Sequence, residues 1–77
     1  MAEQFASYFD KPQFKRTLAH YEKMLLSGSS FYFEAIELTD IAEYYAMQGD
    51  SKRAEAALDY AIRLHPDNID VLIFKAR

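Results

Sequence analysis

The sequence predicts an all-α protein built from antiparallel helical hairpins. Apolar residues recur three and four positions apart in successive segments, which is the spacing of side chains along one face of an α-helix. The two glycines, Gly28 and Gly49, each follow such a segment, and the two prolines, Pro12 and Pro66, each lie near the start of one. Glycine is favoured just past a helix C-terminus and proline near an N-terminus, so both signals predict the same helix ends.

The composition predicts one small, folded, cytoplasmic domain. Among 77 residues, 51% are hydrophobic and 27% are charged, which is typical of a globular chain. The absence of cysteine excludes disulfides and thiolate metal sites. A net charge of −3 disfavours attraction to nucleic acid or to anionic membranes. We expect no signal peptide and no membrane span, because the N-terminus lacks a basic start and no apolar run is long enough.

The first part of the chain is predicted to hold a short helix over residues 1–9 and a longer one that ends near Ser27. Asp10 can cap the longer helix, and Gly28 can end it in the left-handed conformation. The apolar stripe of this helix consists of Phe14, Leu18, Tyr21 and Leu25. Residues 29–33 are predicted to form an extended linker, of which one or two aromatic side chains fill the end of the core.

A helix–turn–helix follows. Its first helix is predicted from Glu34 or Ala35 to Met47, and its second from about Ser51 to Leu64. The turn between them contains Gly49, which supplies the left-handed conformation, and Asp50, which caps the second helix. The predicted inner stripes are Leu38, Ile41, Ala42 and Tyr45 on the first helix and Ala54, Ala57, Leu58, Ala61 and Ile62 on the second. The short alanines predict a close approach of the two helix axes.

Beyond Pro66 a last helix is predicted, with Asp67 or Asn68 as its cap. Its apolar stripe consists of Ile69, Leu72, Ile73 and Ala76. Since helix follows helix along the whole chain, no sheet is predicted.

This pattern resembles the tetratricopeptide repeat, a helical hairpin of about 34 residues that stacks into a superhelix. The residues that fill its signature positions are Leu38, Ile41, Ala42, Tyr45, Gly49, Asp50, Ala54, Leu58, Ala61 and Pro66. The resemblance implies one unit over 35–68, the first helix of a next unit over 69–77, and a divergent capping segment over 1–34. The chain resembles the N-terminal portion of a longer bacterial protein of this family. Lys75 departs from the pattern, because it stands where the repeat has a bulky residue, at the position that corresponds to Ile41.

The resemblance implies a protein–protein interaction scaffold or adaptor without catalytic activity. Such arrays usually bind a peptide or protein along the wall formed by the first helices of their units. The candidate wall residues are Ile36, Thr39, Asp40, Glu43 and Met47. The wall offers no Lys or Asn, so it does not match the clamp with which some members hold a terminal carboxylate. An acidic wall favours a basic or neutral segment, and the alternative is that these carboxylates only form a solvated helix face.

The residues predict no catalytic, cofactor or metal site. His20 and His65 lie on different predicted helices, without the spacing of metal ligands. Residues 28–30 are too short a loop to hold a phosphate, and no glycine-rich loop followed by Lys occurs.

A second hypothesis assigns the chain a structural role, as a capping or self-association module with no external ligand. The last predicted helix displays Ile69, Leu72, Ile73 and Phe74, and the same surface would meet the next repeat in a longer array. An exposed apolar surface of this kind usually pairs with another surface. A homodimer through this helix is therefore expected when the chain is isolated.

Overall fold

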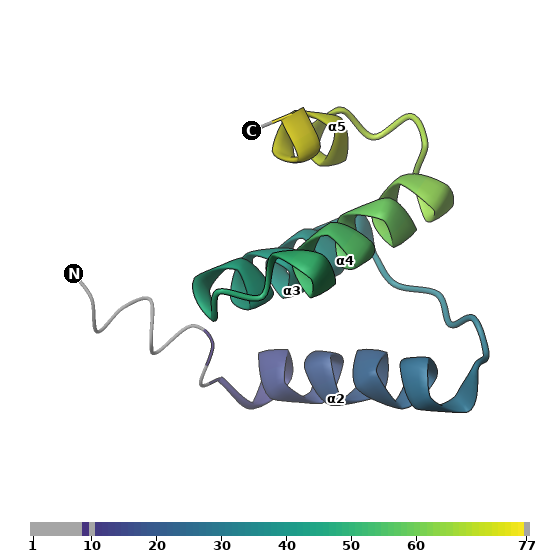
Figure 1. The fold of residues 1–77 in the computed structure, drawn as a ribbon. Helices are drawn as coiled ribbons and strands as arrows, with labels where there is room; N and C mark the ends of the chain where they lie inside the picture. The colour runs from purple at the N-terminus through teal and green to yellow at the C-terminus, as the bar shows by residue number, and fades with distance from the viewer. Residues whose placement is uncertain (1–8, 10, 77) are drawn as a thin grey trace. The chain divides into compact units, whose positions relative to one another are not determined.

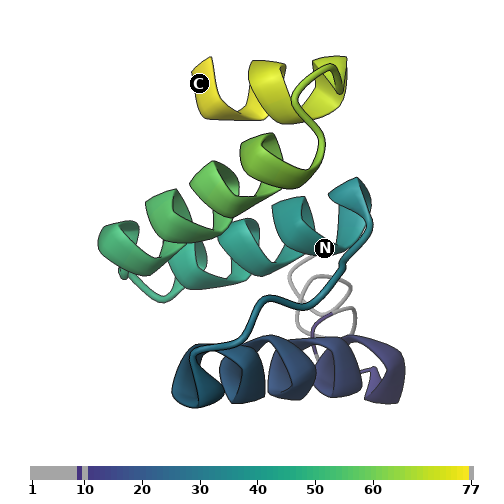
Figure 2. The same cartoon turned by 90° about the vertical axis from the view of Figure 1, so that its right-hand side faces the viewer.

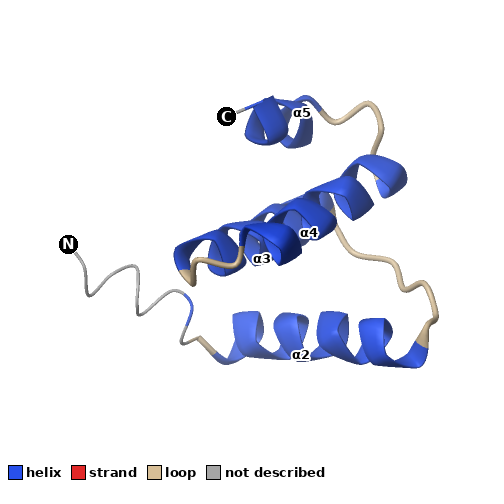
Figure 3. Ribbon diagram, viewed as in Figure 1, coloured by secondary structure: helices blue, strands red, loops and turns tan. Residues whose placement is uncertain are grey.

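The computed structural model describes residue 9 and residues 11–76, with side chains up to residue 73. This part of the chain contains the helices α2 (Pro12–Ser27), α3 (Ala35–Met47), α4 (Ser51–Leu64) and α5 (Ile69–Ala76) (Figure 1). No strand occurs within it, which confirms the all-α prediction (Figure 3). The helix predicted over residues 1–9 falls, apart from residue 9, outside the described residues. The prediction of Asp10 as the cap of the next helix was wrong by one residue, since the N-cap of α2 is Lys11.

The chain divides into two compact units, of which the first ends at Phe31 and the second begins at Tyr32. In the first unit, Lys11 is the N-cap of α2 and Pro12 occupies its first turn. Proline is tolerated there because the N–H that it lacks would have no acceptor within the helix. Gly28 ends the helix with φ 73°, and its N–H donates to the carbonyl of Met24. The predicted C-terminal end of this helix is therefore confirmed.

The buried stripe of α2 differs from the prediction at two positions. Phe14 and Tyr21 are buried as expected, but Leu18 is only half-buried. Met24 is buried where Leu25 was predicted, and Leu25 is exposed. The chain reverses at Gly28, and the backbone N–H of Phe31 then donates to the sulfur of Met24 over 3.1 Å. This contact depends on the path of the linker, which helical periodicity does not describe.

The second unit is built on a hairpin of α3 and α4, which run side by side in opposite directions (Figures 1 and 2). The four residues predicted for the inner face of α3 are all buried, namely Leu38, Ile41, Ala42 and Tyr45. Ala54, Ala57 and Ala61 are buried on α4, whereas Leu58 and Ile62 are half-buried. The alanines leave room for the two helices to approach, as predicted.

The turn between α3 and α4 has the predicted geometry. Gly49 has φ 81°, a conformation that favours glycine. The carboxylate of Asp50 accepts a hydrogen bond from the N–H of Arg53 over 3.1 Å and so caps α4. The Arg53 side chain also lies 3.6 Å from this carboxylate and 5.8 Å from the centre of the Tyr45 ring.

Helix α5 contacts both α3 and α4. Asn68 is its cap, because its side-chain oxygen accepts a hydrogen bond from the N–H of Val71 over 3.1 Å. The buried residue of α5 is Val71, which lies outside the predicted stripe. Ile69, Leu72 and Ile73 lie on the exposed side instead, because the helix is covered on one side and Val71 occupies that side.

Candidate protein-binding surfaces

The first candidate surface is the face of α3 that lies opposite its buried stripe. Of its predicted residues, Ile36 and Met47 are exposed, and Asp40 and Glu43 are half-buried. Thr39 differs from expectation, since it is only 8% exposed. Its hydroxyl donates to the carbonyl of Ile36 over 3.0 Å, so its one donor is used within the helix. Thr39 is therefore not accessible to a partner.

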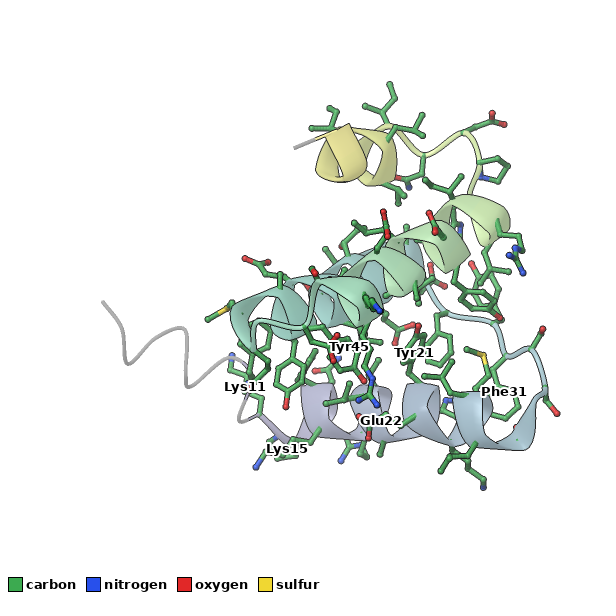
Figure 4. All side chains as sticks on the ribbon, in the orientation of Figure 1. Lys11, Lys15, Tyr21, Glu22, Phe31 and Tyr45 are labelled. Carbon is green, nitrogen blue, oxygen red and sulfur yellow. The ribbon has the colours of Figure 1, made fainter. Side chains whose placement is uncertain are left out.

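The charge of α3 is entirely negative. The segment Ala35–Met47 carries three carboxylates and no Lys, Arg or His. Glu37 has a local role, because its carboxylate accepts a hydrogen bond from the backbone N–H of Glu34 over 2.8 Å at the helix N-terminus. Asp40 and Glu43, both half-buried, are the carboxylates on the candidate surface itself. Tyr45, labelled in Figure 4, belongs to the opposite, buried face of the same helix.

The second candidate surface is the exposed side of α5. Ile69, Leu72 and Ile73 are between 45% and 67% exposed, and their spacing of three and four places them on one face. Phe74, the fourth predicted residue, lies outside the described side chains. Two exposed carboxylates accompany this face, from Asp67 before the helix and Asp70 in its first turn.

Sequence reasoning missed a contact that closes the hairpin. Nε2 of His65, at the C-terminal end of α4, lies 2.8 Å from the carbonyl oxygen of Phe33, just before α3. The Tyr32 ring packs edge-on against the imidazole, with 5.6 Å between ring centres. An antiparallel hairpin brings the end of its second helix next to the start of its first. The predicted hairpin could therefore have indicated that His65 lies near Phe33. We call the group of Tyr32, Phe33 and His65 the clasp.

We expect His65→Ala to lower the free energy of unfolding by about 0.5–1.5 kcal/mol, the usual net contribution of one hydrogen bond. The measurement is urea unfolding followed by circular dichroism. Asp67→Ala is the matched control, because Asp67 is an exposed neighbour outside the clasp. Equal effects of the two substitutions would show that the clasp adds no stability of its own.

Among the described residues, no group of three His, Cys, Asp or Glu side chains is placed to hold a metal ion. Within the same residues, every helix is too short or too polar to cross a membrane.

Comparison with known proteins found no matching family model, no match among curated proteins and no match among solved structures. The resemblance to the tetratricopeptide repeat therefore stays an expectation from the residues.

Proposed function

We propose that this chain is a non-catalytic, protein-binding module of the tetratricopeptide-repeat type. The observation that carries the proposal is the position of α5, which packs against both α3 and α4. In a repeat array, the first helix of each unit packs on the hairpin before it, and stacking buries surface that one hairpin leaves open. The buried alanines of α4 also support this assignment, because they occupy the small-residue positions of the pattern.

The acidic face of α3 defines the chemistry of the proposed partner. Asp40 and Glu43 lie between the exposed apolar side chains of Ile36 and Met47 along the helix. A peptide or protein segment with basic residues and apolar anchors would complement this surface. The proposed module binds protein without a cofactor, nucleic acid or membrane. Its proposed location is the cytoplasm, which the lack of cysteine supports.

The test is selection of binding peptides from a random library, followed by affinity measurement with charge-reversal variants. Glu43→Lys should lower the affinity for the selected peptides about tenfold, because the new lysine repels basic residues on the peptide. Glu55→Lys, an exposed position on α4, is the control and should leave the affinity unchanged. Absence of any specific peptide, or equal effects of the two variants, would contradict the proposal.

A second candidate function is self-association without an external ligand. It is favoured by the three large apolar side chains that α5 exposes together, since such clusters usually mark an interaction site. Under this alternative, the chain forms assemblies through α5, and Leu72→Glu disrupts them.

A further inference from the structure

One exposed face of α2 belongs to neither candidate surface. Four exposed residues share one stripe at spacings of four, four and three, namely Lys15, Ala19, Lys23 and Leu26. We call them the α2 stripe. Leu26 is 90% exposed, and Lys15 extends away from the helix in Figure 4. The stripe lies on the side of the helix opposite the buried residues of α2.

The charge of this region is basic. Arg16 lies beside the stripe and adds a third cation, against one carboxylate from Glu22 in the same stretch of helix. Ala19, in the middle of the stripe, has a short side chain, and a short side chain allows another helix to approach closely. The α2 stripe therefore suits an apolar helix that carries negative charge.

The exposed side of α5 has that chemistry. Its face of Ile69, Leu72 and Ile73 is apolar, and Asp67 and Asp70 place two exposed carboxylates at its N-terminal end. The chain thus carries both a basic–apolar surface and an acidic–apolar surface, on different units.

We propose that the α5 face of one copy docks on the α2 stripe of a second copy. In this contact Leu26 packs among the apolar residues of α5, and the lysines of the stripe face Asp67 and Asp70. Opposite charges favour this pairing, whereas the pairing of two α5 faces would bring four of these carboxylates to one interface. The inference rests on the second candidate function, self-association, and specifies its geometry.

Each copy has one surface of each kind, so the contact is heterologous. A heterologous contact leaves an α2 stripe free at one end and an α5 face free at the other, and association continues beyond two copies unless a ring closes. An isologous contact through α5 alone would stop at a dimer. The two geometries therefore differ in the size of the assembly.

The experiment uses the full chain and two variants, each of which blocks one surface. Leu26→Glu blocks the α2 stripe, and Leu72→Glu blocks the α5 face. Sedimentation velocity over a range of protein concentrations measures the assembly size, and circular dichroism checks that each variant keeps its helices. Ala56→Glu is the matched control, since it introduces the same charge at an exposed residue of α4 that belongs to neither surface.

The wild-type chain should form species larger than a dimer at high concentration. Each variant alone should have a dissociation constant raised by about tenfold or more, because a charge replaces an apolar contact. An equimolar mixture of the two variants should restore association and stop at a heterodimer, because each variant retains the surface that the other lacks. Ala56→Glu should behave like the wild type.

A second pair of variants tests the charges and serves where a glutamate at Leu26 or Leu72 disturbs folding. Lys23→Glu and Asp70→Lys should each weaken association, and their mixture should recover it, because the reversed charges meet each other. A wild-type monomer at high concentration overturns self-association itself. Association that survives both Leu26→Glu and Lys23→Glu overturns only the pairing of α5 with α2.

Discussion

Replacing Phe33 with alanine is expected to remove about 3–5 kcal/mol of stability, the usual cost of deleting a buried phenylalanine ring. The side chain is 2% exposed and is among the largest that the described residues bury fully. A chain of this length has a total stability of only about 4–12 kcal/mol, at roughly 0.05–0.15 kcal/mol per residue. We therefore expect Phe33→Ala to leave a substantial fraction of the protein unfolded without denaturant. Thermal unfolding followed by circular dichroism measures the effect.

Tyr32→Ala is the control for this substitution. Tyr32 is the preceding residue in the same linker, but it is 62% exposed, and its ring packs edge-on against that of His65. Its loss should cost about 1 kcal/mol or less, since exposed aromatic pairs contribute little. Similar losses for Tyr32 and Phe33 would mean that burial of the Phe33 ring does not stabilise the fold.

Enlarging Ala57 to leucine is expected to lower the free energy of unfolding by about 1–3 kcal/mol, through overpacking. Ala57 is fully buried on α4, the helix that packs along α3. Three additional carbon atoms there would push the two helices apart or force strained rotamers on their neighbours. The midpoint of urea unfolding measures the loss.

Ala56→Leu is the matched control, because Ala56 is the adjacent residue of the same helix and is exposed. The helix propensities of alanine and leucine are close, so the change at Ala56 should stay within about 0.5 kcal/mol. If Ala57→Leu were equally harmless, the close packing of α3 and α4 through their small residues would be contradicted.

The bounds of α3 and α4 could be predicted from the sequence because local chemistry determines them. Gly49 adopts a conformation that few other residues tolerate, and Asp50 caps the helix that follows, so the turn is specified by two neighbouring residues. The buried face of α3 was equally predictable, since its apolar residues keep a regular helical spacing.

The parts that could not be predicted depend on contacts between different segments of the chain. Met24 is buried in place of Leu25 where the linker returns and the Phe31 amide meets its sulfur. Val71, rather than a residue of the predicted stripe, faces the hairpin because the position of α5 depends on α3 and α4 together. Thr39 is likewise buried, although the helical spacing of α3 places it outside the apolar stripe. The charges of the candidate surfaces thus follow from the sequence, whereas the exposure of their side chains is predictable only in part.

The clasp has a consequence for the lifetime of the hairpin. It joins two residues that are 32 positions apart, with α3, the turn and α4 between them. Bringing such distant residues together costs little conformational entropy only after the intervening helices have paired, so we expect the bond to form late in folding. Contacts that form after the transition state slow unfolding and leave the folding rate almost unchanged. The His65 contact is therefore expected to lengthen the lifetime of the closed hairpin without changing how fast it forms.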